Sequence, residues 1–178
     1  MTCGSTIKLR HASTKYRLHS HDIPYGSGSQ QQSVTAHPAA NDPNSLWMVK
    51  AGHGYPGCKP GTPIRAGDVI RLQHVTTRKY LHSHHHASPL SHNQEVSAYG
   101  ASDMSDTGDN WVVESKAKWV RGEKMRLKHV DTGMYLISHR KAYSNPIPGQ
   151  LEVCGVAHKN SQGYWHSEEG IYFAHPNN

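Results

Sequence analysis

The feature that most constrains this chain is a stretch of sequence that occurs three times. It reads IKLRHASTKYRLHSH at residues 7–21, IRLQHVTTRKYLHSH at residues 70–84 and MRLKHVDTGMYLISH at residues 125–139. Each copy has an alternating apolar segment that ends in histidine, then a polar turn, then an aromatic-containing segment that ends in Ser-His. Such self-similarity indicates that one structural unit is used repeatedly.

Further markers keep the same spacing along the chain. Three histidines and three tryptophans recur at a nearly constant offset from one another: His11, His74 and His129, and Trp47, Trp111 and Trp165. The short segments QQSV, QEV and QLEV recur between them. We therefore treat the chain as one domain, residues 1–178, and place its three repeats at residues 4–60, 61–120 and 121–176.

Each unit is expected to form four short strands. In the second unit these are expected near residues 68–74, 78–84, 93–99 and 110–114. Alternation places Ile70, Leu72 and His74 on one face of the first strand. Arg71 and Gln73 then lie on the opposite face. The abundant glycine (16) and proline (10) suit short strands that are joined by many turns.

A unit of four short strands cannot bury both of its faces alone. Three units closed around a pseudo-threefold axis would share one core and remove most open strand edges. Propellers normally need four or more blades, and three is the number of a β-trefoil. A stacked solenoid is the alternative, but it would need capping units. We predict an all-β chain with the β-trefoil fold.

The histidines divide by their position in the repeat. His11, His74 and His129 share the inward parity of the neighbouring leucines, so we expect them to be buried and to bond backbone groups at turns. Burial of a neutral histidine would depress its pKa. His21 and His84 close the second strand of their units, as does the corresponding histidine of the third.

A His-x-His pair occurs in two units, formed with His19 and His82, while Ile137 replaces it in the third. Histidines at i and i+2 on a strand face the same way and could hold zinc. A catalytic zinc site also needs a third ligand and a supporting carboxylate, and alternation points His85 away. No H-E-x-x-H and no nearby acid pair occurs, so we predict no metal and no other cofactor.

Other catalytic patterns are missing from the sequence. It contains no G-x-S-x-G, no P-loop, and no cysteine placed by motif near a histidine and an acid. We therefore predict that the protein is not an enzyme. Its net charge is +6, but the positive residues are scattered and the longest basic run is two residues, as at Arg78-Lys79. This pattern argues against nucleic acid as a partner.

The three cysteines are Cys3, Cys58 and Cys154, and no C-x-x-C occurs. Cys3 and Cys58 lie in Gly- and Pro-rich surroundings and could form a disulfide if the compartment is oxidising. Cys154 follows a strand pattern and is expected to be a buried free thiol. We identify no membrane-spanning run, no signal peptide and no retention tail in the sequence. The protein is expected to be a monomer that does not enter a membrane.

The repeated L-H-S-H pattern, together with IPYGSGSQQQSVT, ASPLSHNQEVSAYG and DTGDNWVV, resembles the MIR-domain family. The similarity is to the stromal cell-derived factor 2-like proteins of the endoplasmic reticulum, and it runs from about Thr2 to Phe173. This resemblance implies a β-trefoil of three MIR repeats in the lumen of the endoplasmic reticulum (ER). It also implies a non-catalytic role in protein quality control and the unfolded protein response, with a J-domain co-chaperone and a BiP-type chaperone.

Three ways of working stay open from the sequence. The module could bind unfolded or mannosylated client proteins, act as a lectin-like binder of mannosylated or other glycans, or serve as a structural adaptor. Its tryptophans lie in apolar contexts such as LWMV and NWVV, so they are assigned to the core. The candidate contact residues are Arg17, His19, His21 and Tyr25 in the first unit, Lys79, His82, His84 and His86 in the second, and His139, Arg140 and Tyr143 in the third.

Overall fold

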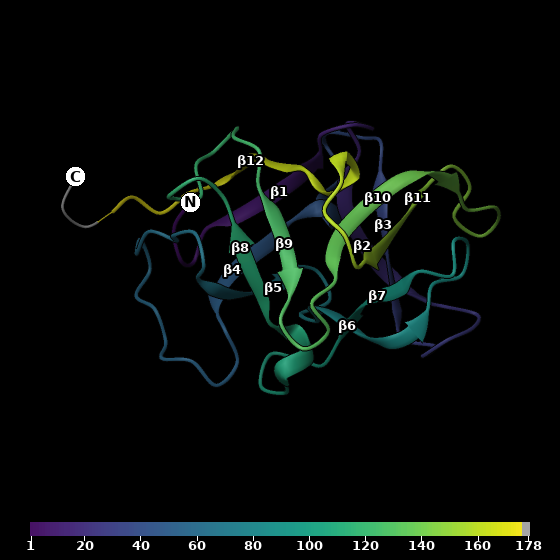
Figure 1. Ribbon diagram of the computed structural model, residues 1–178, viewed down its shortest axis with the longest axis horizontal. Helices are drawn as coiled ribbons and strands as arrows, with labels where there is room; N and C mark the ends of the chain where they lie inside the picture. The colour runs from purple at the N-terminus through teal and green to yellow at the C-terminus, as the bar shows by residue number, and fades with distance from the viewer. Residues whose placement is uncertain (176–178) are drawn as a thin grey trace.

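The computed structural model describes residues 1–175, which form twelve strands and three short 3-10 helices (Figure 1). The first unit holds β1 (Thr6–His11), β2 (Arg17–Pro24), β3 (Gln32–His37), η1 (Pro43–Ser45) and β4 (Trp47–Ala51). The second holds β5 (Val69–His74), β6 (Tyr80–Ala87), β7 (Gln94–Tyr99), η2 (Thr107–Asp109) and β8 (Trp111–Glu114). The third holds β9 (Arg126–His129), β10 (Tyr135–Ala142), β11 (Leu151–Val156), η3 (Ser161–Gly163) and β12 (Trp165–Ile171).

The first and last strands of each unit build a barrel. Antiparallel pairing runs from β12 through β1, β4, β5 and β8 to β9, and a bridge between Met125 and Trp165 closes the ring. The two middle strands of each unit form hairpins, and β3, β7 and β11 pair with one another. A barrel capped by three hairpins around a pseudo-threefold axis is a β-trefoil, so the predicted fold is confirmed.

The predicted strands of the second unit agree with the structure to within a few residues, except that β6 continues to Ala87. The expected boundaries between units, at 60/61 and 120/121, fall in loops. The expected end of the third unit at residue 176 lies outside the described residues. Within residues 1–175 there is no helix long and apolar enough to span a bilayer.

The repeated tryptophans form the centre of the core, as the sequence predicts. Trp47, Trp111 and Trp165 are at most 1% exposed. Their indole Nε1 atoms donate hydrogen bonds of 2.9 Å to the carbonyls of Leu18, Leu81 and Leu136. A buried indole N–H needs such a partner, because leaving it unpaired costs about 1–3 kcal/mol. The same indole–carbonyl hydrogen bond therefore fixes the tryptophan in each of the three units.

The Gly- and Pro-rich connector between β4 and β5 is tied to the N-terminus. Cys58 in this connector forms a disulfide with Cys3, with a Cα–Cα distance of 6.2 Å. The Cys3 amide also donates to the Thr62 carbonyl at 2.8 Å. Cys154 on β11 is free and buried, as predicted.

Candidate functional site

Three histidines are structural and link neighbouring units. His11, His74 and His129 bond through Nδ1 to a threonine hydroxyl three residues later, at 2.8–2.9 Å. Their Nε2 atoms bond to the carbonyls of Gln162, Asn44 and Gly108, at 2.7–2.8 Å. Burial lowers the pKa of all three. The prediction of buried turn histidines is confirmed, and these residues are not offered to a ligand.

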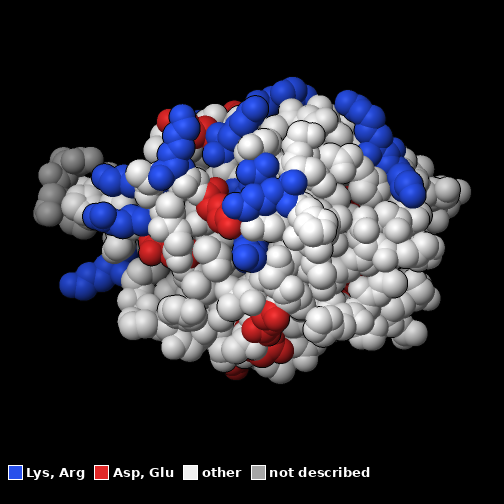
Figure 2. Space-filling model, in the orientation of Figure 1, with Lys and Arg blue, Asp and Glu red and all other residues white. Residues whose placement is uncertain are grey.

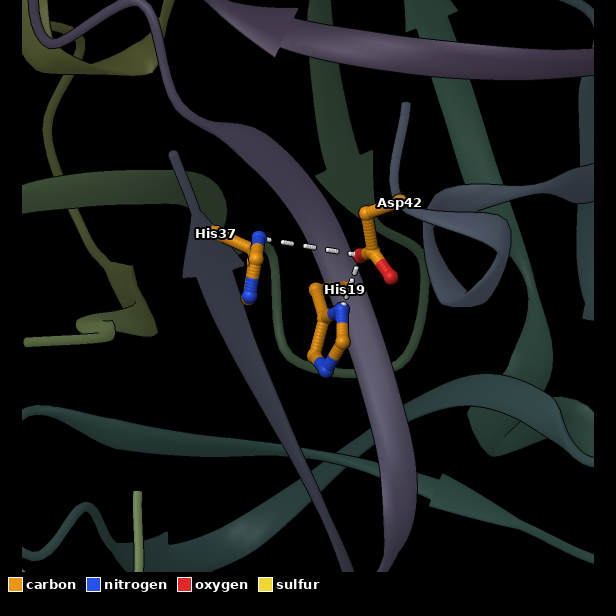
Figure 3. A group of neighbouring side chains, drawn as sticks. All are labelled: His19, His37 and Asp42. Atoms are coloured by element: carbon orange, nitrogen blue, oxygen red, sulfur yellow. Dashed lines mark hydrogen bonds and ion pairs between the residues drawn. The ribbon is translucent and has the colours of Figure 1, made fainter. Parts of the chain in front are cut away.

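A hydrogen-bonded chain crosses the first hairpin. Asp42 caps η1 and bonds to His19 Nδ1, and His19 Nε2 lies 2.8 Å from His21 Nδ1. His21 Nε2 in turn lies 2.7 Å from Ser33 Oγ on β3. Figure 3 shows His37 beside His19, and their rings stack with centroids 4.8 Å apart. A serine, two histidines and an acid are thus connected in series.

The residues are connected in the order of a hydrolytic triad, but the series is a structural hydrogen-bond network rather than a catalytic one. Ser33 is 2% exposed, and its hydroxyl donates to the Ile23 carbonyl at 2.7 Å. Burial, with the neighbouring His19 ring, lowers the pKa of His21 to about 4. The series therefore holds β2, β3 and η1 together and presents no accessible nucleophile.

The lone pairs of this cluster are already used by the protein. Burial raises the pKa of Asp42, but hydrogen bonds from Ser45, His19 and the Asn44 amide outweigh it and keep the carboxyl ionised. The Ala39 amide donates to His37 Nδ1 at 3.2 Å. The planes of the His19 and His37 rings are only 23° apart, so their in-plane lone pairs do not converge on one point. The group is therefore a weak candidate for a metal.

The second unit has a histidine–acid contact equivalent to that between His19 and Asp42. His82 Nδ1 lies 2.9 Å from Asp109 Oδ1 and 3.6 Å from Asp106 Oδ1. Asp109 also accepts from Ser105 and from the Asp106 amide, in a capping box at η2. No acid pair lies near these histidines in the sequence, and the fold brings one to His82 from 24 or more residues away. Ile137 replaces the histidine in the third unit, so no such contact forms there.

Two buried glutamates join neighbouring hairpins. Glu95 on β7 and Glu152 on β11 are both 0% exposed and occupy the place that Ser33 has on β3. Glu95 bonds to His84 and to the amide and hydroxyl of Ser29, in the β2–β3 loop. The loop approaches Glu95 so closely that a side chain at position 28 would not fit, since a Cβ on Gly28 would lie 2.5 Å from Glu95 Oε1.

Glu152 makes equivalent hydrogen bonds to the β6–β7 loop. It accepts from His139 Nε2 at 2.9 Å, from the Leu90 amide at 2.7 Å, and from the amide and hydroxyl of Ser91. Burial raises its pKa, but these hydrogen bonds lower it to about 2. Cys154 lies beside this group, and burial together with the Glu152 charge raises the pKa of its thiol to about 12. A thiol with this pKa is not an activated nucleophile.

The structure therefore divides the eleven candidate contact residues by exposure. Buried members are His19, Tyr25 and His82; half-buried members are Arg17, His21, Lys79, His84, His139 and Tyr143; exposed members are His86 and Arg140. Arg17 forms an ion pair of 2.7 Å with Glu169. The three sets belong to three different units, and of their members Tyr25 and Tyr143 line one shared hollow. A role in ligand or partner contact stays a prediction for the accessible members.

Two hollows offer space near these residues. One, of about 390 Å³, lies where the three hairpin loops meet and is lined by Tyr25, Ser33, Leu90 and Tyr143 among others. The Tyr25 hydroxyl there bonds to the carbonyls of Val34 and Val96, so it is committed to the fold. The other hollow, of about 650 Å³, is open and is lined by several histidines, namely His85, His86, His92 and His158.

Sequence reasoning missed the acids that hold these histidines. Glu95 and Glu152 each precede a core valine in the recurring segments QEV and QLEV, which the repeat alignment already contained. Asp42 and Asp106 each lie five residues before a repeated tryptophan. An alignment of all three units, followed by a search for charged residues at matching positions, would have found both pairs.

The fold and the repeated residues define the class of protein, which is a β-trefoil built from three similar units. The MIR domain family matches residues 23–121. A stromal cell-derived factor 2-like protein of Arabidopsis thaliana is 51% identical, over 97% of this chain and 80% of that protein. The chain belongs to the MIR-domain family, with the stromal cell-derived factor 2-like proteins.

Solved structures agree with this assignment. The crystal structure of the SDF2-like protein from Arabidopsis thaliana superposes with a TM-score of 0.95 and 49% identity, and the match covers 99% of this chain and 98% of that one. A chain of the S. cerevisiae protein O-mannosyltransferase Pmt1-Pmt2 complex, bound to the sugar donor, matches with a TM-score of 0.88 and 34% identity. That match covers 99% of this chain but 26% of the transferase chain.

Proposed function

We propose that the protein is a non-catalytic binding module of the ER lumen. It would act in protein quality control by associating with a J-domain co-chaperone and, through it, with a BiP-type chaperone and its unfolded clients. The observation that carries this proposal is family membership over the whole fold, at about half identity to stromal cell-derived factor 2-like proteins. The sequence resemblance to that family led to the same expectation.

The chemistry of the site supports a binding role. In the histidine–acid groups that could resemble catalytic machinery the acids are buried, and their hydrogen bonds to the histidines hold the hairpins together. The accessible polar residues, such as His86 and Arg140, stand at the hairpin ends, where a partner could reach them. A disulfide between Cys3 and Cys58 suits an oxidising compartment such as the ER lumen.

The test is direct binding to the J-domain co-chaperone of the same organism. We expect a stoichiometric complex in pull-down and calorimetry, and a single monomer peak for the free protein in size-exclusion chromatography. Variants His86→Ala and Arg140→Ala locate the contact, with Lys59→Ala as a matched control at an exposed position away from the hairpins. Absence of any complex with correctly folded partners would refute the chaperone association.

The alternative function is glycan binding. It is favoured by the similarity to the O-mannosyltransferase chain, whose structure was determined with its sugar donor. Trefoil proteins can bind one ligand per unit, so mannosylated peptides are the first probes. We expect signals on a glycan array at high protein concentration under this hypothesis. A silent array, together with a positive co-chaperone experiment, would leave the chaperone role as the function.

A further inference from the structure

The positive charge of the chain is concentrated in one quarter of it. Residues 116–159 contain nine Lys and Arg but only three Asp and Glu, whereas the rest of the chain contains ten of each. The whole formal charge of +6 therefore falls within this segment. One of its three acids, Glu152, is buried and bonded to His139, so it does not offset the charge at the surface.

Four of these nine cations lie together on one face. Arg126 and Lys128 alternate along β9 with the buried Leu127 and His129, and Lys124 precedes them with the same parity. Lys159, in the loop before η3, joins the same group. Figure 2 shows Lys and Arg side chains collected over the region where Figure 1 places β9. We call Lys124, Arg126, Lys128 and Lys159 the β9 basic face.

Two tyrosines hold these cations in place. Arg126 lies over the Tyr164 ring with its guanidinium carbon 3.8 Å from the ring centre, and Lys124 Nζ is 5.1 Å from the same centre. Lys128 and Lys159 both place Nζ 5.6 Å from the centre of Tyr135. Cation–π contacts of this kind order long side chains that would otherwise be mobile. The four positive charges of the β9 basic face are therefore held in defined positions.

The face has little negative charge of its own. Glu114 pairs with Lys159 at 2.9 Å, and among the described residues Lys124, Arg126 and Lys128 form no ion pair with an acid. The corresponding strand of the first unit is different: Lys8 is buried against the Ala40 carbonyl, and Arg10 pairs with Glu168 at 3.0 Å. On the β9 basic face, by contrast, one of the four cations, Lys159, pairs with a carboxylate.

We propose that the β9 basic face is a docking surface for an acidic polypeptide segment. Several carboxylates presented along an extended chain would match cations that alternate along a strand. Exposed ion pairs contribute little individually, but several acting together give measurable affinity and a faster association rate. This face does not show as a run of charge in the sequence, because a strand brings together every second residue.

A polypeptide fits the face better than a nucleic acid does. Single-stranded nucleic acids are held by basic grooves combined with aromatic rings on which bases stack. Here Tyr164 and Tyr135 are each covered by two of the protein's own cations. Tyr135 is also only 7% exposed. This surface has cations for carboxylates to pair with, but it has no uncovered ring on which a base could stack.

The test measures fluorescence anisotropy of a labelled twelve-residue polyglutamate peptide at about 50 mM and 150 mM salt. We expect binding that weakens as salt rises, because exposed charges are screened over about 10 Å at 0.1 M. The variant K124Q/K128Q/K159Q should weaken binding about tenfold. The matched control K15Q/K59Q/R65Q removes the same charge at three other exposed positions and should change binding less than about twofold. A third variant, K124R/K128R/K159R, keeps the charge and should keep the binding.

Each outcome decides the proposal. Equal loss in both charge-removing variants would mean a general effect of net charge and would overturn it, as would no binding at low salt. Tighter binding of an oligothymidylate of equal charge would assign the face to nucleic acid instead. Thermal melts of every variant show whether the fold is kept. The synthetic probe makes the result independent of the chaperone complex proposed above.

Discussion

The imidazole of His74 packs against the indole of Trp47 across the boundary between the first and second units, with ring centroids 4.9 Å apart and planes inclined by 56°. The same contact joins His129 to Trp111 and His11 to Trp165, at 4.8 and 4.9 Å. Each histidine also bonds to a carbonyl of the neighbouring unit. One repeated residue therefore closes all three interfaces between units.

Replacing this histidine should be costly in every unit. His74→Ala removes the ring that contacts Trp47 and leaves the Thr77 amide and the Asn44 carbonyl without their partner. We expect a loss of about 2–4 kcal/mol in the free energy of unfolding, from the cavity and the unpaired groups together. His11→Ala and His129→Ala should cost similar amounts. Denaturant unfolding checks this, and the exposed control His85→Ala should stay within about 0.5 kcal/mol of wild type.

Stability should fall as the pH drops below about 6.5. Burial lowers the folded pKa of His11, His74 and His129, and it lowers that of His21 to about 4. Above 6.5 these groups are neutral in both states. Below it the unfolded chain takes up protons that the folded chain does not, so each group costs up to about 1.4 kcal/mol per pH unit until its folded pKa is reached.

The measurement is the melting temperature between pH 7.5 and 4.5. His21→Asn should reduce the fall, because it removes a group whose folded pKa of about 4 lies well below the unfolded value. His85→Asn is the matched control at an exposed position and should leave the slope unchanged. A melting temperature that stays constant from pH 7.5 to 5.5 would contradict the pKa directions.

Much of the fold was predictable because it depends on features that repeat. The spacing of His11, His74 and His129 gave the number of units, and alternation gave the strands of each unit. Trp47 and its two equivalents were correctly assigned to the core, since their flanking residues are apolar. These features are local, and three copies of each made the pattern stand out from chance.

The hydrogen-bonded clusters were not predictable in the same way. Asp42 lies 23 residues from His19, and Ser29 lies 66 residues from Glu95. Such partners meet only after the hairpins pack around the axis. Unit-specific substitutions also hide the pattern, since Ser33 stands where the other units have glutamate. For the histidine-rich stretch from His82 to His86 we predicted no metal, but the sequence did not reveal that His82 and His84 bond to Asp109 and Glu95.

Glu152 should be essential for closing the β6–β7 loop onto the third hairpin. Glu152→Gln puts an amide N–H₂ group among donors, including the amides of Leu90 and Ser91. We expect a loss of about 2–4 kcal/mol at pH 7, because charge-assisted bonds are replaced by a mismatched group. Hydrogen exchange of the Leu90 and Ser91 amides should become faster. Asp103→Asn, at an exposed position, should change neither quantity.

The pH dependence separates the charge of Glu152 from its shape. Its folded pKa of about 2 lies below the usual 4.5, so its contribution is fully present above 4.5 and is lost as the pH falls toward 2. The stability difference between wild type and Glu152→Gln should therefore shrink across this interval. A difference that stays constant from pH 5 to 2.5 would show that the charge contributes nothing.

The purified protein is expected to hold no stoichiometric metal. The ring nitrogens of His19, His82 and His139 that face carboxylates are used in hydrogen bonds to Asp42, Asp109 and Glu152. Elemental analysis of protein prepared without a nickel column should give less than about 0.1 equivalents of zinc, copper or nickel. One equivalent of zinc that survives dialysis, and is lost in a His82→Ala variant, would overturn this expectation.

The disulfide between Cys3 and Cys58 should stabilise the fold by restricting the unfolded chain. The two cysteines are 55 residues apart, and closing a loop of that size contributes about 4 kcal/mol in the chain-entropy model. Reduction should therefore lower the melting temperature, and the variant C3S/C58S should match the reduced protein. An unchanged melting temperature with a strong reductant would show that the bridge adds no stability.

Thiol counting supplies the control for that experiment, since only Cys154 is free. Burial and the Glu152 charge raise its pKa to about 12, so the folded protein should not react with a thiol reagent at pH 8. Unfolding without reductant should release one thiol, and unfolding after reduction should release three. Three thiols without reductant would mean that the bridge is absent, and the loss of stability on reduction should then vanish as well.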